Sequence, residues 1–196
     1  MNKIVLQEVF LPIREIVLFR HAQKKMSFHI GSQNPELSSE GHRQAQTLVQ
    51  YIHNNTLPHP NLLLTSPKIR AQQTFQPIQD SFKIPLIIAP SLDERVQNEN
   101  SLSFELRVKQ FLLDELFNSY SRHFVSTPYK EKVNTNNACI YICTHLDWLE
   151  VFSWAAPLSD DISSEVLHLP PAHFYHVEIN SELNEPWKLL KKGMVS

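Results

Sequence analysis

Glycine is scarce in this sequence, with only three residues among 196, whereas proline reaches 13. The glycine-rich phosphate-binding loops GxxxxGK[ST] and GxGxxG are absent, because each needs several glycines at fixed spacing. If the protein binds phosphate, side chains must therefore provide the contacts.

Cysteine is equally scarce, and both residues, Cys139 and Cys143, lie in the apolar run ACIYIC. In a strand, with a rise of roughly 3.3 Å per residue, the two side chains share a face but lie about 13 Å apart, too far for a disulfide. We expect two buried core thiols.

Long apolar runs and blocks of like charge are also missing, and the formal net charge is only −2. Nucleic acid and membrane surfaces are therefore not favoured as partners. No run approaches the roughly 18 residues of a membrane span, and polar residues interrupt the first 17 residues before a signal-peptide core could form. We expect a cytoplasmic protein whose residues 1–196 form a single domain.

Two strand-then-helix units occupy the first half of the chain. Residues 15–19 are typical of a buried strand, and the helix that follows has Ser38 or Ser39 as its N-cap. The second unit has a strand at 62–65, with Ser66 as N-cap, Pro67 as the first helical residue and a helix to about Gln79. Arg70 then lies in the first turn of that helix.

The second half of the chain continues this pattern. We predict a helix over 102–120, within a helix-plus-loop insertion at 95–135 that lies over the sheet and the active site. A further helix begins at Asp147 and ends near Ala155, and strands are predicted at 84–88, 138–143, 174–179 and 187–190. Alternating strands and helices indicate an α/β fold, a three-layer sandwich with a mostly parallel central sheet and helices on both faces.

Charged and polar side chains follow three of the predicted strands, namely Arg20-His21, Ser66 to Arg70, and His145. In open α/β sheets ligands bind beyond the carboxyl ends of the strands, so these segments are expected to meet. Cleavage of a phosphate monoester without a metal needs a nucleophile, cations for the phosphate oxygens and an acid for the leaving oxygen.

These residues match that need. His21 is a candidate nucleophile, Arg20 and Arg70 are candidate phosphate clamps, and His145 is a further hydrogen-bond donor. The two guanidinium groups are expected to lower the pKa of His21 and keep its attacking nitrogen free.

The order of these motifs resembles that of the histidine phosphatase superfamily, also called the phosphoglycerate mutase-like family. LFRHAQ at 18–23 is similar to the family's RHG signature, and SPKIRAQQT at 66–74 to its SxxxRAxQT segment. Further similar segments are LSSEGHRQAQTL at 37–48, LDER at 92–95, the helix 99–116, and ICTHLDWL at 142–149. The resemblance covers roughly residues 15–180 and implies the phosphoglycerate mutase-like fold.

By this resemblance, His21 becomes phosphorylated while Arg20, Arg70 and His145 complete the phosphate pocket. Glu94 is the proton donor to the leaving oxygen and then the base that activates water. The neighbouring Asp93 is the alternative acid, and Glu94 is preferred because it fits the family's L-x-E pattern. No metal and no other cofactor is expected, since the remaining histidines lack partners at metal-ligand spacing.

Three positions depart from the family pattern. Ala22 and Leu146 stand where glycine usually follows each histidine, and Ser27 stands where many members have asparagine. Gln23, Lys24 and Ser27 are candidate contacts to the rest of the substrate, and Lys24 or Lys25 is a candidate for binding a second anion.

The resemblance leaves three functions open. The first is a metal-independent phosphatase that hydrolyses a small-molecule or protein phosphomonoester through a phosphohistidine on His21. A phosphoglycerate mutase would instead return the phosphoryl group to another hydroxyl, which requires a lid that excludes water. A non-catalytic phospho-ligand binding module would keep the pocket and lack turnover.

Overall fold

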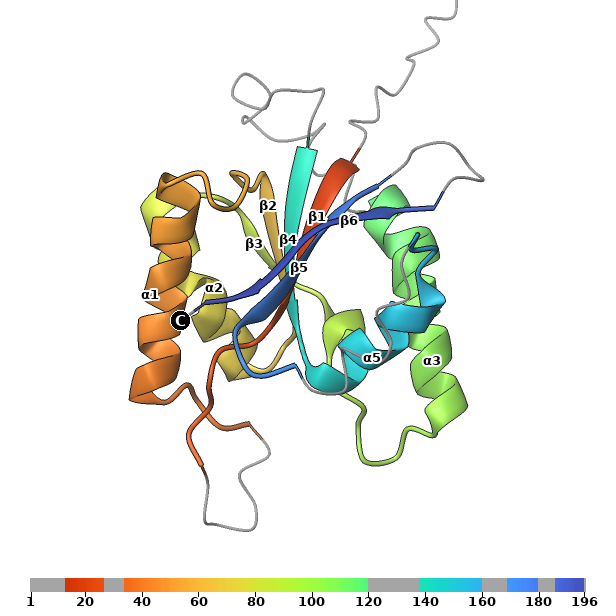
Figure 1. Ribbon diagram of the computed structural model, residues 1–196. Coiled ribbons are helices and arrows are strands. Elements are labelled where there is room, and N and C mark those ends of the chain that lie inside the picture. The colour runs from red at the N-terminus through yellow and green to blue at the C-terminus, as the bar shows by residue number, and fades with distance from the viewer. Residues whose placement is uncertain (1–12, 27–33, 120–137, 160–168, 180–185, 196) are drawn as a thin grey trace, which may run out of the picture.

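The computed structural model describes residues 13–26, 34–119, 138–159, 169–179 and 186–195. One six-stranded sheet, in the order β3-β2-β4-β1-β5-β6, forms its centre (Figure 1). The neighbours from β3 to β1 are parallel, whereas β5 is antiparallel to both β1 and β6. The bounds are β1 Ile13–Arg20, β2 Leu62–Thr65, β3 Leu86–Ile88, β4 Ala138–Thr144, β5 His173–Glu178 and β6 Lys188–Met194. The predicted mostly parallel sheet is confirmed.

Helices cover both faces of this sheet, which confirms the predicted three-layer sandwich (Figure 1). The helices α1 (Ser39–His53) and α2 (Ile69–Phe82) lie on one face. The other face carries α3 (Ser101–Gln110), a π-helix (Phe111–Ser119) and α5 (Leu146–Ala155). The last part of the predicted insertion, residues 120–135, lies outside the described residues.

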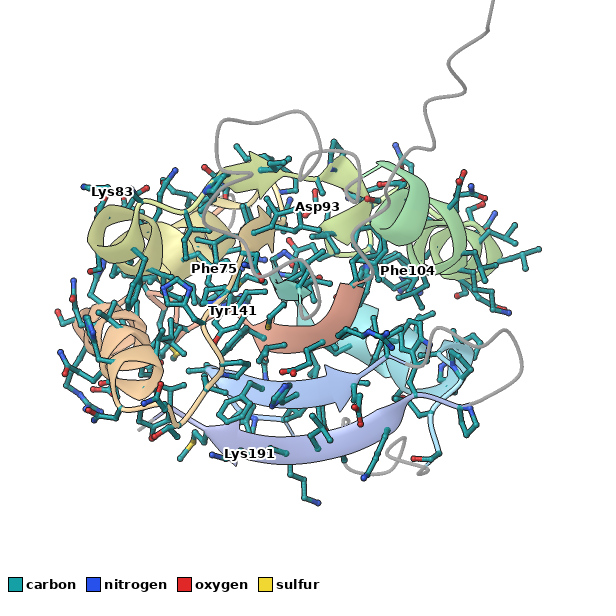
Figure 2. All side chains as sticks on the ribbon, turned by 90° about the horizontal axis from the view of Figure 1, so that it is seen from above. Phe75, Lys83, Asp93, Phe104, Tyr141 and Lys191 are labelled. Atoms are coloured by element: carbon teal, nitrogen blue, oxygen red, sulfur yellow. The ribbon has the colours of Figure 1, made fainter. Side chains whose placement is uncertain are left out.

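The core consists of two apolar clusters, one on each face of the sheet. Successive side chains of a strand point to opposite faces. Along β4, Ile140 and Ile142 accordingly face one cluster, and Tyr141 faces the other. Figure 2 shows Phe75 and Tyr141 on one side of the sheet and Phe104 on the other. Strands buried on both faces explain why the sequence shows continuous apolar runs there.

The two cysteines lie in this core as expected, both buried and both free. Burial raises the pKa of the Cys139 and Cys143 thiols above the ordinary value. The prediction of two buried core thiols is confirmed.

The start of α2 corrects a prediction. Ser66 is not the N-cap, because its backbone amide still belongs to the sheet and donates to the Cys143 carbonyl over 3.0 Å. Lys68 is the N-cap and the helix begins at Ile69, so Pro67 precedes the helix and Arg70 remains in the first turn. The helix also continues to Phe82, beyond the predicted end near Gln79.

Strand β6 is longer than the predicted 187–190, since it runs from Lys188 to Met194. Its lysine-rich second half has no apolar pattern, and pairing with β5 extends the strand there. Gly193 faces Phe174, where an added Cβ would lie 2.8 Å from the ring. A larger residue at this point of the hairpin would require the Phe174 ring to shift.

The carboxyl ends of the parallel strands meet at one edge of the sheet. Arg20 pairs with Thr144, and Thr65 pairs with both Cys143 and Ile88. The ladder continues for one more residue, because the His21 amide donates to the Thr144 carbonyl over 3.0 Å. This register brings the residues that follow β1, β2, β3 and β4 together. Within the described residues, no helix is long and apolar enough to cross a membrane.

Candidate active site

His21 follows β1 and is buried, with 5 % of its surface exposed. Its Nδ1 lies 2.8 Å from the Ala22 carbonyl oxygen, which can only accept a hydrogen bond. Nδ1 therefore carries the proton of the neutral ring, and Nε2 keeps its lone pair. Arg70 Nε donates to that Nε2 over 3.1 Å. This tautomer places the lone pair of the candidate nucleophile on the side of the arginine.

Burial is the main reason why the pKa of His21 falls from 6.5 to about 3. The positive charges of Arg70, Arg20 and Lys24 lower it further, and the hydrogen bond to Ala22 opposes them. The sequence predicted the direction of this pKa shift but attributed it to the two arginines. Desolvation is the larger cause, because the ring loses most of its contact with water.

Arg70 is the centre of the site, with 1 % of its surface exposed. Besides His21, it contacts Glu94 and His145: Nη2 lies 2.5 Å from Glu94 Oε2 and 3.2 Å from His145 Nδ1. Nη1 is buried without a hydrogen-bond partner among the described residues. Its position in the first turn of α2 brings the guanidinium to the carboxyl edge of the sheet.

His145 follows β4 and is 2 % exposed. Its ring centroid lies 5.2 Å from that of His21, so the two imidazoles from distant parts of the chain share one site. Burial is the main cause that lowers the pKa of His145, followed by the interaction with His21 and by the positive charge of Arg70. Like His21, the ring is neutral at neutral pH.

The two acidic candidates in the loop after η1 (Pro90–Leu92) differ in their contacts. Glu94 contacts Arg70 through Oε2, and its Oε1 lies 3.5 Å from Lys68 Nζ. The Glu94 side chain is 33 % exposed. Asp93 points to Ser66, whose Oγ lies 3.3 Å from Oδ1, and its side chain is only 16 % exposed. Glu94 is thus the carboxylate beside the arginine with access to solvent.

Arg20 takes a different direction from the one expected of a phosphate clamp. Its Nη1 donates to the Leu169 carbonyl, and Nε is buried without a hydrogen-bond partner among the described residues. Burial lowers the pKa of Arg20, which Asp147 raises and Arg70 lowers again. The charge of Arg20 acts on His21 in this arrangement, but the structure shows no direct contact of the two side chains.

The loop after His21 is held by residues whose role sequence reasoning missed. Thr74 Oγ1 accepts from the Ala22 amide over 3.0 Å, and Gln44 Oε1 accepts from the Gln23 amide over 2.9 Å. At Gly41 an added Cβ would lie 2.0 Å from the Gln23 carbonyl oxygen. These residues belong to the motifs at 37–48 and 66–74, so the motifs themselves were the available signal.

Arg107 on α3 holds the loop that carries Glu94. Nη1 donates to the carbonyls of Ser91 and Asp93 over 2.9 Å each, and Nη2 donates to the Glu94 carbonyl over 3.2 Å. Glu99 balances the charge of Arg107 with a 2.7 Å ion pair. Arg107 lies within the similar helix at 99–116, but its contact with the loop was not predicted from the sequence.

The residues predicted to contact the rest of the substrate differ in their own contacts and exposure. The Gln23 side chain accepts from Ser38 Oγ, and Lys25 forms a 2.7 Å ion pair with Glu36. Lys24 is exposed, and its charge lowers the pKa of both His21 and His145. Ser27 lies outside the described residues. In the described part of the chain no cluster of three or more His, Cys, Asp or Glu side chains is placed to hold a metal ion.

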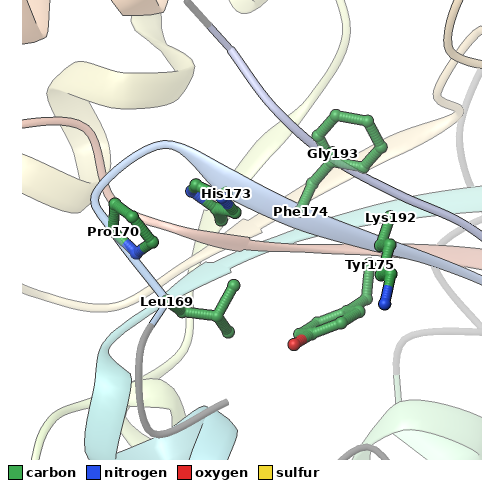
Figure 3. A pocket seen from close by; sticks show the side chains of 7 residues that line it. All are labelled: Leu169, Pro170, His173, Phe174, Tyr175, Lys192 and Gly193. Carbon is green, nitrogen blue, oxygen red and sulfur yellow. The ribbon is translucent and has the colours of Figure 1, made fainter. Parts of the chain in front are cut away.

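A separate pocket of about 290 Å³ lies at the hairpin of β5 and β6 (Figure 3). It adjoins Arg20 through Leu169, whose carbonyl accepts from Arg20. None of the predicted site residues lines it. The lining consists of Leu169, Pro170, His173, Phe174, Tyr175, Lys192 and Gly193.

Ala22 and Leu146, which replace glycines of the similar family, fit their positions without backbone strain. The described non-glycine residues with positive φ are Asn55, Lys83 and Ala172. Neither Ala22 nor Leu146 adopts the left-handed conformation that favours glycine.

A family model for the histidine phosphatase superfamily (branch 1) matches residues 16–105 of the chain. The predicted resemblance to the histidine phosphatase superfamily is confirmed. His21, Arg70 and Glu94 lie within the matched range, and His145 lies beyond it. No curated protein sequence is significantly similar to the chain.

Several solved structures of phosphatases share the fold of this chain. A mycobacterial glucosyl-3-phosphoglycerate phosphatase is 15 % identical with a TM-score of 0.63, over 90 % of this chain and 97 % of that one. The alpha-ribazole phosphatase of Shigella flexneri is 19 % identical with a TM-score of 0.62, over 93 % and 96 %.

A phosphoserine phosphatase mutant of Entamoeba histolytica in complex with phosphoserine is 16 % identical with a TM-score of 0.60, over 91 % and 95 %. At such identities the three likenesses show the fold alone.

Proposed function

We propose that the protein is a metal-independent phosphatase that transfers the phosphoryl group of a monoester to Nε2 of His21 and then to water. The observation that carries this proposal is the tautomer of His21. Nδ1 is committed to the Ala22 carbonyl, and Nε2 presents its lone pair beside the buried guanidinium of Arg70. A neutral imidazole next to a fixed cation is suited to attack a phosphate dianion.

In the first step, Arg70 moves its hydrogen bonds from His21 and Glu94 to the phosphate oxygens. The unpartnered Nη1 of Arg70 adds a further donor, and Arg20 contributes positive charge beside His21. Nε2 attacks phosphorus, the bond from phosphorus to the leaving oxygen breaks, and Glu94 in its protonated form gives its proton to that oxygen. The hydrogen bond from Nδ1 to Ala22 stabilises the positive charge that develops on the ring.

In the second step, the Glu94 carboxylate takes a proton from water, and the resulting hydroxide attacks the phosphorus of the phosphohistidine. The bond between Nε2 and phosphorus breaks, and His21 regains its lone pair. Glu94 suits both steps because its side chain reaches Arg70 and retains contact with solvent.

One experiment separates this function from the two alternatives. The protein is incubated with p-nitrophenyl phosphate and with phosphoglycerates, and an acid-labile phosphohistidine is trapped by rapid quenching. We expect release of phosphate and a label on the wild type, and neither on His21→Ala. Isomerised phosphoglycerate without release of phosphate would indicate a mutase, and a bound phosphate without label or turnover would indicate a binding module.

Lys24 is proposed to contact a second anionic group of the substrate. Of the two candidate lysines, Lys25 forms an ion pair with Glu36, whereas the charge of Lys24 lowers the pKa of both histidines of the site. A substrate with a carboxylate or second phosphate should therefore lose more affinity in Lys24→Ala than in Lys25→Ala, measured as KM.

A further inference from the structure

A chain of hydrogen bonds leads from His145 through Ser66 to Asp93. His145 Nε2 lies 2.7 Å from Ser66 Oγ, and this hydroxyl donates to Asp93 Oδ1 over 3.3 Å. Ser66 and His145 are buried, with 0 % and 2 % of their surfaces exposed. The chain occupies the side of His145 that faces away from Arg70.

The chemistry of the partners fixes the direction of these hydrogen bonds. Arg70 can only donate, so the Nδ1 of His145, 3.2 Å from Nη2, accepts. A neutral ring then carries its proton on Nε2 and donates to Ser66 Oγ. The Lys68 amide donates to the same oxygen over 3.2 Å. With two hydrogen bonds accepted, the Ser66 hydroxyl directs its own proton to the Asp93 carboxylate.

When a phosphate dianion occupies the pocket, Nδ1 of His145 must donate a hydrogen bond instead of accepting one. Its Nδ1 faces the centre of the site, and it can serve a phosphate oxygen only if it donates. The ring achieves this by taking up a proton from solvent at Nδ1 while Nε2 keeps its hydrogen bond to Ser66. Both nitrogens then donate, one to the dianion and the other through Ser66 toward the negative charge of Asp93.

We propose that Ser66 and Asp93 are positioning residues that hold His145 in its Nε2-protonated form and support its imidazolium form when a phosphate dianion binds. This proposal rests on the proposed function, because it requires that the pocket bind a phosphate dianion. Sequence reasoning assigned Ser66 only to a helix cap and Asp93 only to an alternative acid, and the structure joins both to His145 instead.

The charges that face His145 explain why a ligand is needed for this change. Asp93 Oδ1 lies 3.8 Å from Nε2, and Glu94 Oε2 lies 3.9 Å from Nδ1. Burial opposes the imidazolium form of His145 in the free protein. The interaction with His21 opposes it next, followed by the positive charges of Arg70, Lys68 and Lys24. A bound dianion adds the negative charge that offsets them.

The free protein provides the first test, which does not depend on activity. Nitrogen-15 NMR of the histidine rings distinguishes a protonated from a bare ring nitrogen. We expect His145 of the wild type to be protonated at Nε2 alone, and Ser66→Ala to show a mixture of both ring tautomers, because Arg70 then holds the Nε2-protonated form without Ser66. An Nδ1-protonated ring in the wild type, or a tautomer ratio in Ser66→Ala equal to that of the wild type, would overturn the proposal.

Sulfate provides the second test, because it is a dianion without a titrating proton between pH 5 and 9. Calorimetry in buffers of different ionisation enthalpy measures the protons taken up on binding. We expect the wild type to take up close to one proton and Asp93→Asn to take up clearly less, with sulfate bound roughly 10- to 100-fold more weakly. Asparagine keeps the hydrogen-bond chain and removes its charge, so this variant remains informative if Ser66→Ala does not fold.

Ser153→Ala is the matched control, since it removes a buried hydroxyl on α5 that donates only to the Glu150 carbonyl. It should bind sulfate and take up protons like the wild type. Equal proton uptake in wild type and Asp93→Asn would contradict the proposal even if the phosphatase assay succeeds. A wild type that shows the expected tautomer and proton uptake but neither turnover nor phosphohistidine would contradict the proposed function alone.

Discussion

Arg70 Nε donates a hydrogen bond to His21 Nε2 over 3.1 Å, so the buried cation of the site contacts the nitrogen that we propose as the nucleophile. In the free protein this contact engages the lone pair of Nε2, and burial is the main reason why the ring stays neutral. A phosphate dianion competes for the same guanidinium, because a charge-assisted bond to an anion is stronger than one to a neutral ring. In the proposed mechanism, binding of the substrate therefore also frees the lone pair of His21 Nε2.

Arg70→Lys should lower kcat/KM for p-nitrophenyl phosphate by about 10²- to 10³-fold, the loss typical of a removed transition-state donor. A lysine ammonium cannot contact His21, Glu94 and His145 with the planar geometry of the guanidinium. Steady-state kinetics measure this effect, and a thermal melt checks folding. Lys25→Ala, which removes an exposed ion pair, should stay within about twofold. Near-normal kinetics of Arg70→Lys would argue against the guanidinium as the phosphate clamp.

Glu94→Gln should slow hydrolysis of alkyl phosphates by about 10²- to 10⁴-fold, since their alkoxide leaves only with a proton. Hydrolysis of p-nitrophenyl phosphate should fall much less in the first step, because nitrophenolate needs little protonation. Burst kinetics on both substrates separate the first step from the second. Glu36→Gln, an exposed carboxylate variant, is the control. Equal losses on both substrates would assign the acid to another group.

The stability of the protein should fall as the pH is lowered from about 7.5 to 5, in part because of His21. Its pKa is about 3 in the folded protein and 6.5 ordinarily, so the unfolded chain binds more protons in this range. Stability therefore rises with pH between these two values and is lost as the pH falls. The contribution of His21 over this interval is about 2 kcal/mol.

Urea unfolding of wild type and His21→Gln at pH 7.5 and pH 5 measures this difference. The glutamine variant should lose less stability on acidification than the wild type. His42→Gln changes an exposed histidine and serves as the control, with an acid loss close to that of the wild type. A wild-type loss no larger than that of His21→Gln would contradict a neutral buried nucleophile.

Thr74→Val should destabilise the protein by about 1–3 kcal/mol and reduce turnover, because the Ala22 amide loses its buried acceptor. The matched control is Thr47→Val. Both threonines donate to the carbonyl four residues earlier, but Thr47 is not buried and holds no part of the loop after His21. Denaturant midpoints and kcat should therefore change far more at position 74 than at position 47. Similar effects at both positions would show that the hydroxyl does not position the nucleophile loop.

The sequence alone was sufficient for the layers of the fold and for the neighbourhood of the site. Runs such as 15–19 and 138–143 are apolar because their strands are buried on both faces, and this signal is local. Parallel strands end at one edge, so residues that follow them, such as His21 and His145, could be expected to meet.

Contacts between distant side chains required the tertiary structure. The boundary of α2 depended on the bond from the Ser66 amide to Cys143, which no local pattern reveals. The low pKa of His21 arises mainly from burial, a property of the assembled site rather than of neighbouring residues in sequence. The tautomer of each histidine follows from the hydrogen-bond partner of its Nδ1. The Ala22 carbonyl accepts from Nδ1 of His21, whereas Arg70 donates to Nδ1 of His145. The sequence was sufficient to predict which side chains form the site. The tertiary packing determines which nitrogen of each histidine carries a proton.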